Sequence, residues 1–190
     1  MSTTTLNGLN TELMAETIEA IKQQPTLAKF QFRARNQWKG GSVNQSTIKD
    51  FYGAGQEDQS REEPFVFVNG EPPVLLGGNE GANPVEFLLH AVVGCLTTTL
   101  VVHATARGIR IQSISTTLEG EIDMRGLLNL DPSVPVGYDQ IRIKMDVTAD
   151  CSDEELEELL EFARNHSPVT QTVCRPVPVV VQRVAAAVAR

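Results

Sequence analysis

The feature that most constrains the fold is a long run without charge, residues 87–106. Asn83 and Pro84 stand just before it as a helix N-cap and first helical residue, and Glu86 follows three residues after the cap. Gly108 is placed to end the helix. A helix that is apolar on every side is buried on every side. We therefore expect sheet, other helices or a second subunit to enclose it.

Composition excludes several classes of protein. The 16 basic and 24 acidic residues give a net charge of −8, which argues against a nucleic-acid binder and against a polybasic membrane anchor. The apolar run is about as long as a membrane span, but His90, His103 and four threonines favour a buried soluble helix. The first residues carry no basic region followed by an apolar segment, so no signal peptide is predicted. We expect a cytoplasmic protein without membrane or nucleic-acid partners.

Hydrophobic patterning along the rest of the chain predicts a mixture of helices and strands. We expect helices at 10–23, at 153–165 and after Ser167, and strands at 28–38, 42–51, 64–68, 72–76, 113–124, 141–149 and from 175 onward, with a loop at 53–63. The elements do not alternate regularly, which indicates an α+β fold. Residues 1–27 are predicted to form an N-terminal helical extension and residues 28–190 the main domain.

Three cysteines, too few and too scattered for a disulfide scaffold, leave Cys95 as the most suggestive residue. No familiar zinc spacing is present, so no metal or other cofactor is expected. Two interpretations of Cys95 stay open. It is a small buried residue that fills the core, or it is a nucleophile, which requires a cationic neighbour or a helix N-terminus to stabilise the thiolate.

Few residues are placed by the sequence to assist such a thiol. Glu86 stands nine residues before Cys95, which at 100° per residue puts the two on opposite faces of the helix. Arg33 and Arg35 share one face of the predicted strand 28–38, normally the solvated face. If that face meets the central helix instead, either arginine could pair with a thiolate.

Two segments together resemble a known family. Residues 83–111, NPVEFLLHAVVGCLTTTLVVHATARGIRI, resemble the central-helix signature of the OsmC/Ohr family of osmotically inducible and organic hydroperoxide resistance proteins. The likeness lies in Asn-Pro, an acidic residue, an apolar helix, a small residue followed by Cys, and a closing Arg-Gly-Ile. Residues 167–173, SPVTQTV, resemble the second motif of the family, which usually begins Cys-Pro. The resemblance extends over about residues 30–184.

The resemblance implies an OsmC-like fold: an intertwined homodimer in which antiparallel sheets from both subunits enclose long buried central helices. It also implies a thiol pocket at the interface. In the peroxidase members a cysteine on the central helix attacks a hydroperoxide, assisted by an arginine and a glutamate. A second cysteine then forms a disulfide that a dithiol reopens.

The family's site residues carry over unevenly. Cys95 matches the reactive cysteine, but Ser167 replaces the second one, and a serine there is also simply a helix cap. Cys174 lies seven residues further on. The acid is Glu86, one step later than usual, and Arg33 and Arg35 substitute for the arginine by proximity alone.

Two functions follow from these residues. One is a thiol-dependent peroxide-reducing protein that uses Cys95, a small-molecule hydroperoxide and an external thiol reductant. The other is a non-peroxidatic dimer that binds a small apolar ligand or acts as a redox-sensitive protein.

Overall fold

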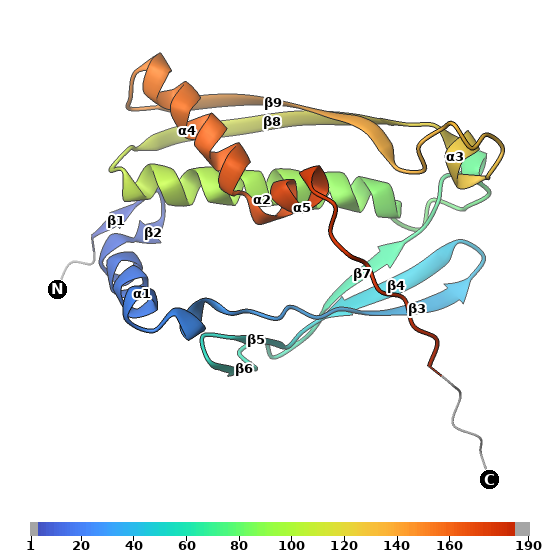
Figure 1. Ribbon diagram of the computed structural model, residues 1–190, viewed down its shortest axis with the longest axis horizontal. Coiled ribbons are helices and arrows are strands. Elements are labelled where there is room, and N and C mark those ends of the chain that lie inside the picture. The colour runs from blue at the N-terminus through green and yellow to red at the C-terminus, as the bar shows by residue number, and fades with distance from the viewer. Residues whose placement is uncertain (1–3, 185–190) are drawn as a thin grey trace, which may run out of the picture.

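The computed structural model describes residues 4–184, and a long helix, α2 (Pro84–Ala106), runs through its middle (Figure 1). Its start is the predicted one. The Asn83 side chain accepts a hydrogen bond from the Glu86 N–H at 2.9 Å, and the Glu86 carboxylate accepts one from the Asn83 N–H at 2.8 Å. Gly108 has a φ of +75°, the left-handed conformation that commonly terminates helices. The capping signals in the sequence therefore locate the helix correctly.

A long antiparallel hairpin covers one side of α2 (Figure 1). It consists of β8 (Ile111–Ile122) and β9 (Tyr138–Ala149), joined through the short helix α3 (Met124–Leu127). Both predicted strands are confirmed. Their alternating apolar residues, Ile114 on β8 and Ile143, Met145 and Val147 on β9 among them, pack against the core on the α2 side.

Two further helices complete this half of the molecule. The helix α4 (Asp153–His166) crosses over α2, and α5 (Pro168–Cys174) follows after one residue (Figure 1). The predicted capping box at the start of α4 is present. The buried core is formed by α2 and α4, through Leu96, Leu100, Ala104, Leu159 and Ala163. These helices on a strand hairpin confirm the predicted α+β class.

The N-terminal part forms a second layer on the other side of α2 (Figure 1). Its elements are β1 (Thr5–Leu6), β2 (Leu9–Asn10), α1 (Thr11–Gln23), the 3₁₀ helix η1 (Pro25–Ala28), and the sheet β3 (Arg35–Gly40), β4 (Val43–Ile48) and β7 (Phe65–Asn69) in the order β3-β4-β7. A separate hairpin pairs β5 (Phe51–Gly53) with β6 (Gln56–Asp58). The boundary predicted at residue 27 stays a prediction.

Asn7 fastens the N-terminal hairpin to the rest of the molecule. Its side-chain amide donates to Thr105 Oγ1 at 3.1 Å and to the Ile109 carbonyl at 2.9 Å. Its side-chain oxygen accepts from the Ile111 N–H at 2.8 Å. One side chain therefore connects the turn between β1 and β2 to the end of α2 and the start of β8.

Four of the predicted elements are wrong or displaced. The strand predicted at 28–38 is regular only from Arg35, because Pro25 begins a 3₁₀ turn and residues 29–34 make a single bridge, Gln31 to Tyr52. The loop predicted at 53–63 contains β6, since Ala54 and Gly55 adopt positive φ and reverse the chain.

Proline explains the other two. The strand predicted at 72–76 is a 3₁₀ helix, η2 (Pro73–Leu75), because adjacent prolines have no N–H to donate to a sheet. Residues 175–184 form no strand, and Pro176 and Pro178 interrupt the ladder that the prediction required. The remainder of that predicted strand lies outside the described residues.

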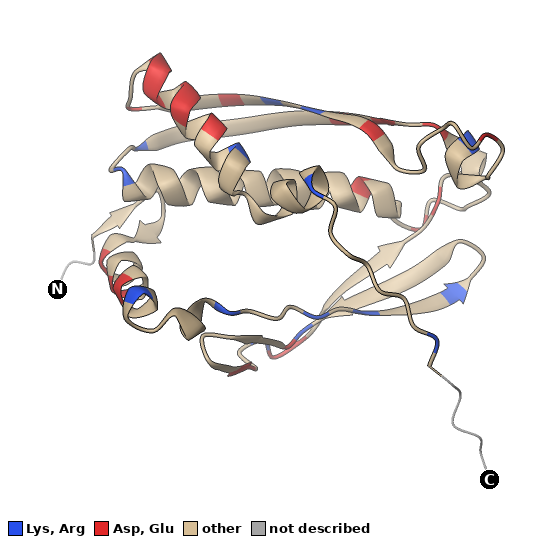
Figure 2. Ribbon diagram, viewed as in Figure 1, with Lys and Arg blue, Asp and Glu red and all other residues tan. Residues whose placement is uncertain are grey.

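Within a single chain α2 is not buried on every side, so its enclosure by a second subunit stays a prediction. Its buried residues are Val92, Leu96, Leu100, Ala104 and Thr105, all toward the hairpin and α4. Leu88, Ala91, Gly94 and Thr98 on another face are exposed, although Figure 2 shows α2 almost free of charge. By length and mean hydropathy, 1.9, α2 is the one helix of the described chain that could cross a membrane. One layer of β8 and β9 is too narrow to cover the whole helix.

Candidate functional site

The Cys95 thiol lies half-buried at the middle of α2, where α5 packs against this helix. The backbone N–H of Val169, in the first turn of α5, donates to Cys95 Sγ at 3.5 Å. A fixed backbone N–H that points at an atom stabilises negative charge developing there. The local structure that presents this N–H is the turn between α4 and α5, and its geometry depends on Ser167.

Ser167 is fully buried, with 0% of its surface exposed. Its N–H donates to the Ala163 carbonyl at 2.8 Å, which ends α4. Its hydroxyl oxygen accepts from the Thr170 hydroxyl at 2.9 Å and from the Thr170 N–H at 3.4 Å, which starts α5. The predicted cap is confirmed. The residue in the place of the family's second cysteine therefore lies two residues from the N–H that contacts Cys95, and it cannot form a disulfide.

Cys174, the other thiol considered as a resolver, lies at the end of α5. It is exposed and follows Val169 by five residues, about 140° around the helix. The Cys174 side chain therefore leaves α5 about 140° around the helix from the Val169 side chain. It lines a cavity of about 510 Å³ instead, with Val92, Leu96, Ile141, Ile143, Met145, Glu157, Leu160, Glu161, Arg164, Thr170 and Val173.

This cavity is mainly apolar, with charge only at α4. The Arg164 guanidinium contacts Glu161 at 2.6 Å and holds the pKa of that carboxyl at about 2. Because Arg164 and Glu161 neutralise each other and Glu157 remains, the polar side of the cavity carries a small excess of negative charge. A neutral apolar molecule suits such a cavity better than an anion does.

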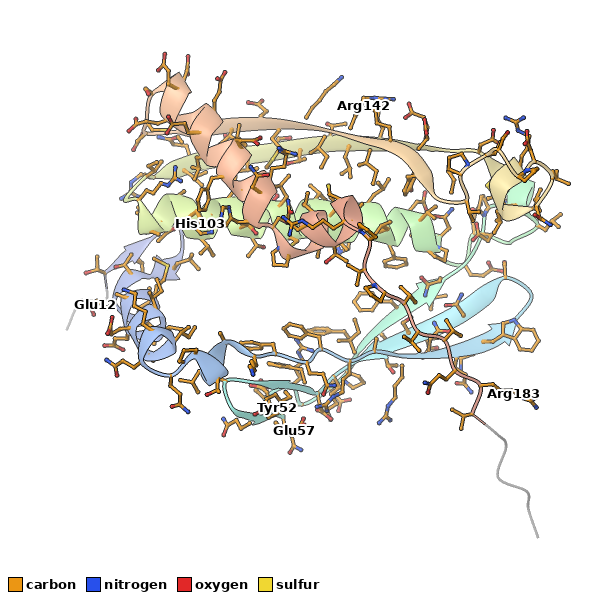
Figure 3. The ribbon with its side chains drawn as sticks, viewed as in Figure 1. Glu12, Tyr52, Glu57, His103, Arg142 and Arg183 are labelled. Atoms are coloured by element: carbon orange, nitrogen blue, oxygen red, sulfur yellow. The ribbon has the colours of Figure 1, made fainter. Side chains whose placement is uncertain are left out.

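The other predicted supporting residues do not meet Cys95 within this chain. The Glu86 carboxylate is occupied at the N-cap of α2, on the opposite face of the helix. Arg33 binds Glu57 at 2.6 and 2.9 Å and lowers the pKa of that carboxyl through this hydrogen bond. Figure 3 shows Glu57 in the N-terminal layer, away from β8 and β9. Arg35 lines a cavity of about 270 Å³ with Arg33 and Lys49, which Cys95 does not reach.

Sequence reasoning missed two features of this region. The first is the Val169 N–H, for which no signal exists, because every residue except proline has one. The second is a cluster of His103 on α2 with Phe162 and His166 on α4. The spacing of Phe162 and His166, four residues apart on one helix, places them together, but only the crossing of α4 over α2 adds His103. Within residues 4–184 no three His, Cys, Asp or Glu side chains are grouped to hold a metal ion.

Comparison with solved structures finds several proteins to which this chain is similar. An OsmC-like protein from Mycoplasma pneumoniae superposes with a TM-score of 0.59 at 17% identity, covering 76% of this chain and 87% of that one. An OsmC-like protein of unknown function from Vibrio cholerae gives 0.53 at 11% identity, covering 75% and 92%. A Legionella pneumophila protein described as an organic hydroperoxide resistance protein, OsmC, gives 0.49 at 14% identity, covering 75% and 89%. No curated protein sequence matches the chain.

The fold and the half-buried thiol on the central helix define an OsmC-like α+β protein. A family model described as OsmC-like protein matches residues 77–182, more than half of the chain. The chain therefore belongs to the OsmC-like protein family, as its central-helix residues indicate.

Proposed function

We propose that this protein is a thiol-dependent peroxide-reducing member of its family, in which Cys95 attacks organic hydroperoxides. The observation that carries the proposal is the contact between the Val169 N–H and Cys95 Sγ at 3.5 Å. A cysteine that only filled the core would need no donor directed at its sulfur. The thiolate is the nucleophilic form of cysteine, and the Val169 N–H is directed at the sulfur atom that would carry its charge.

The chemistry needs three steps and two equivalents of an external thiol. The Cys95 thiolate attacks the outer peroxide oxygen, the O–O bond breaks, and the alkoxide leaves with a proton as an alcohol. Cys95 is then a sulfenic acid. One external thiol forms a mixed disulfide with Cys95 and releases water, and a second thiol reduces that disulfide and regenerates the Cys95 thiol.

An external thiol is required because the chain lacks a placed resolver. Ser167 has no sulfur, and Cys174 is exposed at the opposite end of α5 from Val169. The cytoplasm supplies such thiols, because glutathione and thioredoxin keep it reducing. We therefore place the protein there.

We also propose that the working form is a homodimer. The exposed apolar face of α2, including Leu88 at 37% exposure, has no cover among the described residues. Phe30 and Phe32 in the N-terminal layer are 51% and 71% exposed. Burying such surfaces against a second copy removes apolar area from water. The geometry of such a dimer would also determine whether Arg33 or Arg35 of one subunit approaches the Cys95 of the other.

A second function is favoured by a different observation, the cavity of about 510 Å³ beside α5. Its volume falls within the range of small-molecule sites, about 300–1,000 Å³, and its lining is mainly apolar. In that case the protein binds a small apolar ligand, and Cys95 is a packing or redox-sensitive residue.

The test is the reaction of reduced protein with cumene hydroperoxide in the presence of a sulfenic-acid trap, followed by peptide mass spectrometry. We expect rapid modification of Cys95, none in Cys95→Ser, and the wild-type rate in the matched control Cys174→Ser. Modification of Cys95 no faster than that of free cysteine would refute the enzyme and leave the ligand-binding function. A Cys95–Cys174 disulfide would refute the need for an external thiol.

A further inference from the structure

Three aromatic side chains and one guanidinium meet where α4 crosses the end of α2. The Phe162 ring stacks on His166 with a centroid distance of 3.7 Å and an interplanar angle of 10°. His103 meets Phe162 edge to face at 4.7 Å, and the two histidine rings are 6.0 Å apart. The Arg107 guanidinium lies 4.9 Å from the centre of the Phe162 ring. We call these four residues the histidine cluster, and Figure 3 shows His103 at this end of α2.

Two ionisable groups face His103, namely His166 and Arg107, and both are positively charged when they are protonated. Burial lowers the pKa of His103 below its ordinary value of 6.5, and then His166 on α4 and Arg107 on α2 lower it further. The β1–β2 turn, which packs on the same end of α2, contributes the neutral Asn7. No carboxylate is among the groups that shift this pKa. The cluster therefore has no negative charge to neutralise a second histidinium.

Two histidinium ions in this packing would repel each other, and Arg107 adds a third positive charge beside them. His166 lies in the last turn of α4, and its Nδ1 is 2.8 Å from the Phe162 carbonyl. A second proton on His103 would gather three like charges around Phe162. The favoured response is separation of the end of α4 from α2.

That separation would reach the Cys95 site directly. His166 is followed by Ser167, the cap shared by α4 and α5, and then by the turn whose Val169 N–H contacts Cys95. The buried end of α4 holds this turn in place. A change at His166 therefore passes to Cys95 through three residues of chain.

We propose that the histidine cluster is an acid-sensitive latch: protonation of His103 beside His166 and Arg107 releases the end of α4 and α5 and uncovers Cys95. The latch acts on the packing of α5, so it does not depend on Cys95 being catalytic. Its working range is that of histidine, between about pH 5 and pH 8. Because folding lowers the pKa of His103, the packing is weakened as the pH falls below 6.5.

The chain offers a matched control, because it contains three histidines and the third is outside the cluster. His90 lies on the same helix as His103 and is exposed. The variant His103→Gln removes the titration and keeps a polar side chain. His90→Gln makes the same change at the control position, and His166→Gln gives a second test should His103→Gln not fold.

Hydrogen–deuterium exchange of residues 163–172 measures the latch, with rates corrected for the intrinsic effect of pH. From about pH 7.5 to about pH 5.5 we expect protection in the wild type to fall about three- to tenfold, the effect of like charges 6.0 Å apart. His90→Gln should show the same fall, and His103→Gln or His166→Gln should abolish it. Unchanged protection in the wild type would overturn the proposal. An equal fall in both cluster variants would also overturn it.

Cysteine accessibility gives an independent readout. The probe is 4,4′-dithiodipyridine, an aromatic disulfide that reacts with thiols in acid, and each rate is expressed relative to that of a free thiol under the same conditions. In the wild type and in His90→Gln, this relative rate of Cys95 modification should be higher at the lower pH. In the cluster variants it should not change with pH. Equal acceleration in all of these proteins would show that the histidine cluster does not control access to Cys95.

Discussion

Replacement of Ser167 by alanine tests whether one hydroxyl holds the turn that contacts Cys95. The Ser167 hydroxyl oxygen is the acceptor for two donors of Thr170, its hydroxyl at 2.9 Å and its N–H at 3.4 Å. Ser167 is 0% exposed and Thr170 is 7% exposed, so water cannot easily replace the lost acceptor. The substitution removes one atom and leaves two buried donors without a partner.

The expected cost follows from these contacts. Loss of a serine N-cap costs about 0.5–2 kcal/mol, and a buried donor left without a partner costs about 1–3 kcal/mol. Both terms act through the same oxygen, so they are not fully additive. We expect the free energy of unfolding to fall by about 2–3 kcal/mol.

Urea denaturation of Ser167→Ala and of a matched control, Ser152→Ala, measures this cost. Ser152 caps α4 in the same way, through its hydroxyl and the Glu155 N–H at 3.2 Å, but it is exposed. Water can satisfy the donors there, so Ser152→Ala should cost only about 1 kcal/mol. Equal costs for the two variants would refute the argument that burial makes Ser167 the more important cap.

Three further predictions come from other parts of the molecule. Leu100→Ala should lower the free energy of unfolding by about 2.7–5 kcal/mol, because Leu100 is fully buried and leaves a cavity; urea denaturation measures this. Asn7→Ala should lower the free energy of unfolding by about 2–3 kcal/mol, because three hydrogen bonds are lost and the Ile111 N–H is left without its acceptor. Asn7→Asp keeps that acceptor and should cost less. NMR titration of Glu161 should give a midpoint of about 2, and Arg164→Gln should return this midpoint toward 4.5. Because folding lowers the pKa of Glu161, its ion pair with Arg164 stabilises the protein above pH 4.5, and this stabilisation is lost as the pH falls through about 2.

Local signals in the sequence predicted the elements that depend on neighbouring residues. The caps at Asn83 and Ser152 located α2 and α4 because each is completed within three residues. The alternation of apolar and polar residues in 113–124 and 141–149 located the two strands of the long hairpin, because this alternation is also a local pattern. Prediction failed at 72–76 and 175–184, where prolines outweigh an apolar pattern that otherwise resembles a strand.

The candidate site was predictable only in part. Cys95 and the motif beginning at Ser167 could be identified because their order resembles a known family. The role of Ser167 as a cap could also be predicted, since the residue before a helix and a following proline are a local pattern. The contacts of Arg33 and Arg35 could not, because the strand that was to present them begins only at Arg35.

The sequence by itself determined that this chain has a central helix uncharged after Glu86, strands with one apolar face and a cysteine at the middle of that helix. These properties follow from the identity and spacing of residues along the chain. Only the tertiary structure decided that a backbone N–H meets Cys95, that Cys174 lines a separate cavity and that His103 joins His166. Each of these depends on the crossing of α4 and α5 over α2, which joins residues more than sixty positions apart. Such a crossing is set by how side chains fill the core between helices, and no short stretch of sequence records it.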